Sequence, residues 1–145
     1  MNKQLASYQK AQVSGASQRD LIVMCYKGGI KYLVDARQKL EAGDINGFSD
    51  LIEKAHRVIF HLYTTLDMEK GGEIAERLGD LYVYIINQLY LLNATKKQEL
   101  FEGLIKVMTT LKEGWENLDS RALQGEFEGK SAPGTAAPQV VSVQI

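Results

Sequence analysis

The sequence predicts an all-α protein, an antiparallel up-down four-helix bundle with a short N-terminal helical arm and a flexible C-terminal tail. Both prolines, Pro133 and Pro138, lie near the C-terminus, so residues 1–130 contain no residue that forbids a helix. Apolar residues recur there every three or four positions in four segments. The four predicted helices span residues 17–42, 45–67, 72–94 and 96–118. Because the connections between them are short, each helix should run antiparallel to the next.

The first two helices have recognisable starts. Ser17 and Asp20 approximate a capping box in which aspartate replaces the usual glutamate, so the first helix should begin at Ser17. Its apolar positions keep helical spacing until Gly43. Asp44 is expected to cap the second helix, whose apolar stripe recurs at threes and fours. That stripe consists of Phe48, Leu51, Ile52, Ala55, Ile59, Leu62 and Leu66.

The third and fourth helices follow two further breaks. Lys70, Gly71 and Gly72 interrupt the helical pattern, and the segment that follows them is the most apolar in the bundle. Thr95 is expected to cap the fourth helix, which carries a single apolar stripe and should end near Asp119.

On this pattern the chain divides into three parts. An arm occupies residues 1–16, the bundle residues 17–119 and the tail residues 120–145. Residues 131–145 carry no charge and include both prolines, a composition that is typical of linkers and tails. The aliphatic residues at the end of the tail could instead pair as a strand.

Composition and charge exclude several classes of partner. The chain has 17 Lys and Arg against 18 Asp and Glu, so its overall field gives no reason to expect nucleic acid. The longest apolar run, residues 81–94, is shorter than the roughly 20 residues that a membrane-spanning helix needs, so no membrane insertion is expected. Cys25 is the only cysteine, and its apolar setting suits a reducing compartment. We therefore expect a cytoplasmic protein of the cytosol.

No catalytic residue stands out. His56 and His61 are five residues apart, about 140° around a helix, whereas paired helical metal ligands sit three or four apart. The glycine pairs at 28–29 and 71–72 fit no phosphate-binding motif and follow no predicted strand. Cys25 has no histidine nearby in the sequence to lower its pKa. We therefore expect no enzyme, no metal site and no cofactor.

The unusual feature of the sequence is its surplus of apolar helix surface. The third helix is apolar nearly all round, although a helix of a four-helix bundle normally turns one face to water. Its residues outside the core stripe are Val83, Tyr84, Ile86, Tyr90 and Leu91. The first helix has a second apolar row, which consists of Ile22, Tyr26, Ile30 and Leu33. Such surfaces predict docking of an apolar partner. The alternative is that both helices are merely well buried or that the protein dimerises through them.

The arm is a candidate cover for this surface. Leu5 and Tyr8 share one side of a short helix, which is too short to be stable unless it is docked. The arm should then either compete with a partner for this apolar surface or contact the partner directly. The candidate partner-binding residues are Leu5, Tyr8, Tyr26, Ile30, Tyr82, Val83, Ile86 and Tyr90.

Several motifs taken together resemble the FliS family, the cytoplasmic export chaperones of bacterial flagellin. The resemblance runs from residue 5 to about residue 118 and does not include residues 131–145. Its most specific part is the run Gly71-Gly72-Glu73-Ile74-Ala75 with Leu81-Tyr82 and Tyr84. It rests also on Tyr8-Gln9, on the stretch Tyr26-Lys27-Gly28-Gly29-Ile30 and on Trp115.

This resemblance implies a helical bundle that binds the disordered C-terminal segment of flagellin. It further implies that the protein prevents premature polymerisation in the cytoplasm and delivers flagellin to the flagellar type III export apparatus. Surplus apolar surface and a displaceable arm fit such binding of a helix in a groove. The alternative is a homodimeric structural or adaptor bundle without flagellin binding. When free, the protein should be a monomer or a weak homodimer.

Overall fold

The computed structural model describes residues 17–117, so the predicted arm and the predicted tail lie outside the described residues. Four helices account for nearly all of the described chain, and no strand occurs within it. Their bounds are α2 Gln18–Glu41, α3 Ile45–Thr64, α4 Met68–Thr95 and α5 Glu99–Glu116. The predicted all-α class is confirmed, and each predicted helix has a counterpart.

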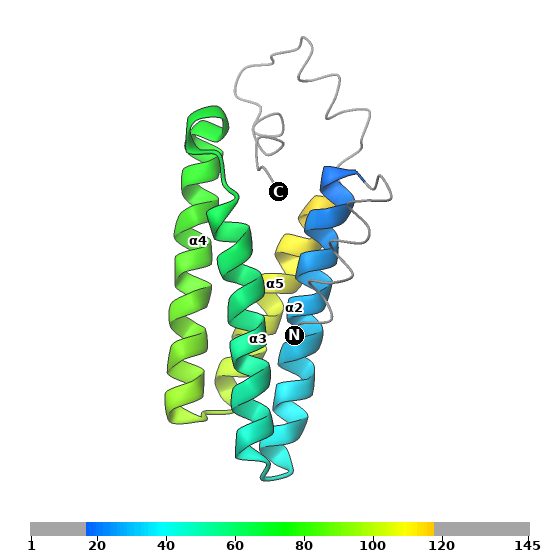
Figure 1. The fold of residues 1–145 in the computed structure, drawn as a ribbon, viewed down its shortest axis with the longest axis vertical. Coiled ribbons are helices and arrows are strands. Elements are labelled where there is room, and N and C mark those ends of the chain that lie inside the picture. The colour runs from blue at the N-terminus through cyan, green and yellow to red at the C-terminus, as the bar shows by residue number, and fades with distance from the viewer. Residues whose placement is uncertain (1–16, 118–145) are drawn as a thin grey trace.

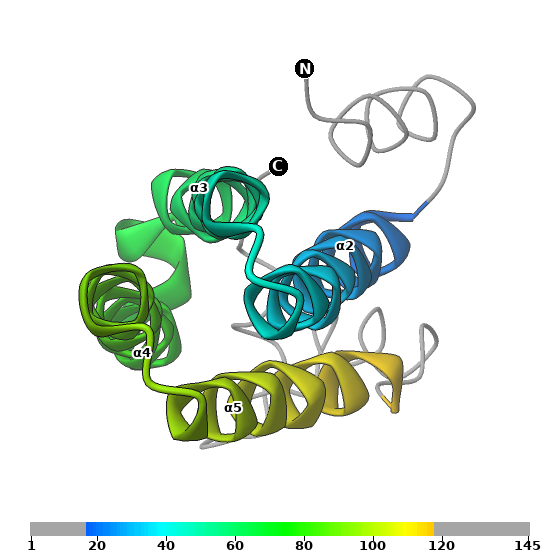
Figure 2. The same cartoon turned by 90° about the horizontal axis from the view of Figure 1, so that it is seen from below.

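The helices form an antiparallel up-down bundle, as predicted. Helices α2, α3 and α4 lie side by side, and each runs opposite to the one before it (Figure 1). Helix α5 crosses obliquely over the open side of this layer, as the view from below shows (Figure 2). Helix α2 therefore packs against both α3 and α5, whereas α4 packs mainly against α3.

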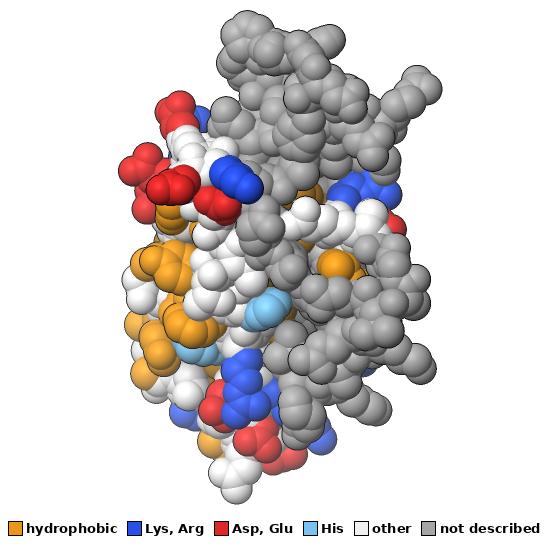
Figure 3. All heavy atoms as spheres, turned by 45° about the horizontal axis from the view of Figure 1, so that its top comes forward, with side chains coloured by type: hydrophobic (Ala, Val, Ile, Leu, Met, Phe, Trp, Pro, Cys, Tyr) orange, Lys and Arg blue, Asp and Glu red, His pale blue; other side chains and the backbone are white. Residues whose placement is uncertain are grey.

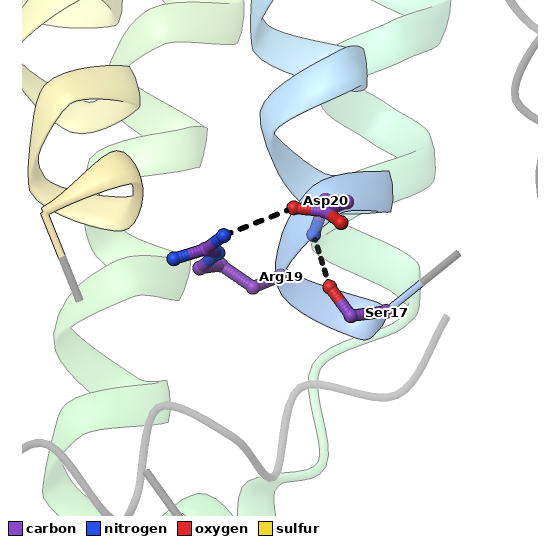
Figure 4. Close-up of polar contacts among 3 residues, drawn as sticks. All are labelled: Ser17, Arg19 and Asp20. Carbon is purple, nitrogen blue, oxygen red and sulfur yellow. Dashed lines mark hydrogen bonds and ion pairs between the residues drawn. The ribbon is translucent and has the colours of Figure 1, made fainter. Parts of the chain in front are cut away.

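The N-terminal caps of α2 and α3 are those predicted. The Ser17 hydroxyl accepts a hydrogen bond from the backbone N–H of Asp20 at 3.0 Å (Figure 4). The Asp20 carboxylate accepts from the Arg19 guanidinium at 3.2 Å. At α3, the Asp44 carboxylate accepts from the N–H of Gly47 at 2.9 Å. Each cap satisfies a backbone donor that the first turn of a helix leaves without a partner.

Helix α4 begins at Met68, whereas the break at residues 70–72 predicted a start at residue 72. The Asp67 carboxylate caps it by accepting from the N–H of Lys70 at 2.9 Å, and the first turn starts at Met68. Gly72 then adopts φ 55° and ψ −134°, a non-helical conformation that kinks the helix. Only glycine populates that region readily, so a side chain at position 72 would strain the kink. The glycine pair marks a bend inside α4, not its beginning.

The predicted Thr95 cap of the fourth helix is wrong. Helix α4 continues through Thr95 and ends because Lys96 adopts the left-handed conformation, with φ 57°. The Thr95 hydroxyl donates back to the carbonyl of Leu91 at 2.8 Å, a bond that threonine makes readily within a helix. Helix α5 starts after Gln98, which makes no capping hydrogen bond through its side chain.

The core fills the space enclosed by the four helices. Its largest fully buried side chains are Tyr26, Tyr82, Phe48, Phe101, Ile22, Leu33, Ile59, Leu62, Ile85, Leu89, Leu92 and Leu104. Three residues of the predicted outward row on the first helix, Ile22, Tyr26 and Leu33, are therefore core residues. The reason is geometric, because α2 lies between α3 and the oblique α5 and is covered on both sides.

Candidate partner-binding surface

The outward face of α4 carries large apolar side chains, as the sequence predicted. Val83, Tyr84, Tyr90 and Leu91 are exposed, and Tyr90 is the most exposed of them at 61%. Ile86 is half-buried and packs against the core. Figure 3 shows hydrophobic side chains gathered along the α4 side of the molecule, close to the histidines of α3. Such a grouping is wider than the scattered apolar residues of an ordinary surface.

Three aromatic side chains of α3 continue this surface from Tyr90 of α4. We call Tyr63, Phe60, His56 and Tyr90 the aromatic row. The rings of His56 and Phe60 stack with centroids 6.1 Å apart, and Phe60 lies 6.4 Å from Tyr63. His56 also meets the Tyr90 ring of α4 at 5.2 Å. The row therefore joins the two helices across the seam between them, and Phe60, which is 50% exposed, stands out from it.

An open pocket of about 340 Å³ lies at one end of the aromatic row. Its walls come from the first half of α3 and the last turns of α4. The lining residues are Ser49, Asp50, Ile52, Glu53, His56, Leu89, Tyr90 and Asn93. The hydroxyl of Ser49 donates to the side-chain oxygen of Asn93 at 2.9 Å and so links the two helices beside the pocket. The aromatic row and this pocket share His56 and Tyr90, and we call the surface that they form together the α3–α4 groove.

The structure corrects two of the predicted partner-binding residues. Tyr26 and Tyr82 are fully buried, and their hydroxyls share a hydrogen bond of 2.6 Å across the core. Burial raises the pKa of both phenols, so both stay neutral at physiological pH. Their place is the core, because Tyr26 lies on the covered α2 and Tyr82 on the inner side of α4.

Of the other six predicted partner-binding residues, the four that the structure describes differ from one another in exposure. Val83 and Tyr90 are exposed, whereas Ile30 and Ile86 are only partly accessible. Leu5 and Tyr8 lie outside the described residues.

Phe60 and His56 are parts of the surface that the sequence pattern did not predict. Phe60 does not fit the apolar stripe of its helix. The buried stripe residues Ile59 and Leu62 are three positions apart, and Phe60 lies between them in the sequence. An aromatic residue on the polar side of an amphipathic helix is the signal that could have identified it.

The described residues offer little for catalysis. Burial raises the pKa of the Cys25 thiol to about 12, which leaves it without the thiolate that a nucleophile needs. Within residues 17–117, no group of three or more His, Cys, Asp or Glu side chains is arranged to hold a metal ion. Nor does any helix of that range have the length and apolarity needed to cross a membrane.

Comparison with known proteins assigns the family. The family described as "Flagellar protein FliS" matches residues 1–122. The chain is 34% identical to the flagellar secretion chaperone FliSB of Pseudomonas aeruginosa over 120 residues, which cover 80% of this chain and 95% of that protein. It is 34% identical to the flagellar secretion chaperone FliS of Salmonella typhimurium over 114 residues, which cover 78% and 84%. The protein of that name from Vibrio cholerae is 28% identical over 122 residues, which cover 81% and 90%. The chain therefore belongs to the FliS family, a family of chaperones and not of enzymes.

Proposed function

We propose that this protein is an export chaperone that binds the disordered C-terminal segment of flagellin in the α3–α4 groove. The observation that carries the proposal is the aromatic row, in which exposed Phe60 and Tyr90 stand on either side of one seam between two helices. Membership of the FliS family supports the identity of the partner.

The binding mode is that of a helix laid into an apolar groove. An amphipathic segment of flagellin becomes helical as it docks, and its apolar side covers the aromatic row and the outward apolar residues of α4. Ordering a disordered segment costs about 2–5 kcal/mol or more, so a wide apolar contact is needed to offset it. The groove, with the exposed Tyr90 on its α4 side, and the outward Val83 of the same helix offer a contact of that kind.

Docking explains both parts of the chaperone role. A flagellin segment held on the groove is not free to assemble with other flagellin molecules in the cytosol. The same complex keeps the segment unassembled until the flagellar type III export apparatus receives it. Leu5 and Tyr8 of the arm belong to this proposal, either as competitors for the groove or as direct contacts.

Removing the C-terminal segment from flagellin should abolish binding. The experiment is a calorimetric titration of the full chain with intact flagellin and with flagellin that lacks its C-terminal segment. We expect heat of binding only with intact flagellin, because the groove has no apolar helix to receive in the truncated form.

Light scattering on the same samples separates the proposal from its alternative. A chaperone that is a monomer or a weak homodimer gains the mass of flagellin when the two are mixed. A structural homodimer keeps the same mass with or without flagellin. That result, together with the same heat of binding for intact and truncated flagellin, would contradict the proposal.

A further inference from the structure

The pocket at the end of the α3–α4 groove differs in chemistry from the rest of the groove. Its floor is apolar, since Ile52 and Leu89 are buried core residues. One wall is the exposed ring of Tyr90. Its rim carries two carboxylates, Asp50 and Glu53. The aromatic row, in contrast, contains no carboxylate.

The negative charge at this rim is only partly balanced. The Glu53 carboxylate accepts from the Arg57 guanidinium one turn further along α3, at 3.2 Å. Asp50 makes no ion pair with any side chain of residues 17–117. The lining contains no lysine or arginine from that range. The nearby Lys96 ammonium donates to the backbone carbonyl of Asn93 at 2.9 Å and lies over the Phe48 ring, and it makes no ion pair with Asp50 or Glu53.

An apolar floor, an aromatic wall and an acidic rim together suit a long basic side chain. The methylene stem of a lysine or arginine can lie on apolar surface while its charged end stays at the rim. A cation beside an aromatic face is attracted to the ring, and a carboxylate adds to that attraction. A pocket of about 340 Å³ is at the small end of ligand sites, which fits one side chain better than a whole metabolite.

We propose that this pocket receives a lysine or arginine of the docked partner helix, held between the Tyr90 ring and the Asp50 carboxylate. The proposal rests on the proposed function and adds to it the chemistry that fixes the register of the partner. Asp50 and Phe60 are ten residues apart on α3, a separation of about 15 Å along the helix. The partner helix should therefore carry its basic residue about three turns from the apolar residue that packs on Phe60.

The test is calorimetry of the full chain with the C-terminal segment of flagellin, at about 0.05 M and about 0.3 M salt. Asp50→Asn keeps the shape of the side chain and removes its charge, so binding at low salt should weaken roughly three- to tenfold. Asp50→Lys should weaken it further, because the pocket then repels the incoming cation. Glu113→Gln is the matched control, since it removes one exposed carboxylate from α5 and should leave binding unchanged.

A double-mutant cycle identifies the partner residue. Each Lys and Arg of the flagellin segment is changed to Gln in turn and titrated against the wild-type chain and against Asp50→Asn. One of these flagellin substitutions should weaken binding to the wild-type chain but should not weaken binding to the Asp50→Asn chain any further. Equal affinity of wild type and Asp50→Asn at low salt, or the absence of any coupled residue, would overturn this inference alone. Failure of the wild type to bind the segment would overturn the proposed function, and this inference with it.

Discussion

Replacing Tyr90 by glutamate should remove most of the affinity for the flagellin segment without unfolding the protein. Tyr90 is 61% exposed on α4 and touches the His56 ring of α3, so it stands at the centre of the proposed groove. Aromatic residues of this kind are common binding hot spots, and losing one costs about 2 kcal/mol or more. We expect a loss of roughly thirtyfold or more in affinity, measured by calorimetry.

The control for this experiment is Val34→Glu. Val34 is an exposed aliphatic residue of α2 and lies outside the residues that form the α3–α4 groove. Both variants should keep the helical circular dichroism of the wild type, because exposed substitutions usually change stability by no more than about 0.5 kcal/mol. Unchanged binding by Tyr90→Glu, or equal losses in both variants, would show that the groove is not the binding surface.

Replacing Tyr82 by alanine should have the largest effect on stability. Tyr82 is fully buried and shares a hydrogen bond with Tyr26, so the change leaves a cavity and takes away the partner of that hydroxyl. Truncating a buried aromatic residue to alanine typically costs about 3–5 kcal/mol, a large part of the 5–15 kcal/mol that stabilises an ordinary domain. Urea unfolding followed by circular dichroism measures this loss.

Two further variants show whether burial is the cause. Tyr84→Ala changes the same residue type two positions along α4, where the side chain is 50% exposed, and should cost less than about 1 kcal/mol. Tyr82→Phe removes only the hydroxyl and should cost about 1 kcal/mol. Similar unfolding midpoints for Tyr82→Ala and Tyr84→Ala would mean that Tyr82 is a surface residue, as the sequence alone suggested.

Local signals in the sequence predicted most of the fold. Helical periodicity located all four helices, and the Ser17 and Asp44 caps fixed the starts of two of them. These features depend on residues close together in the chain, which is why they can be read without a structure. The start of α4 was harder to predict from the sequence, because glycine pairs occur both at helix ends and at bends. Gly72 lies at a bend within α4.

The candidate site was predicted only in part, because its boundary depends on how the helices pack. The pattern of α4 predicted its exposed Val83 and Tyr90. It did not predict that the oblique α5 covers the second row of α2, which moves Tyr26 into the core. The pairing of Tyr26 with Tyr82 joins residues 56 positions apart, a contact that periodicity does not reveal.

The most direct test of the account is an NMR footprint of the flagellin segment on the full chain. Backbone amide signals of the isotope-labelled protein are compared before and after the segment is added. The account predicts that the signals that shift belong to α3 and α4 and centre on Phe60, Val83 and Tyr90, with those of α5 unaffected. Shifts centred on α2 and α5, or no shifts at all, would contradict it.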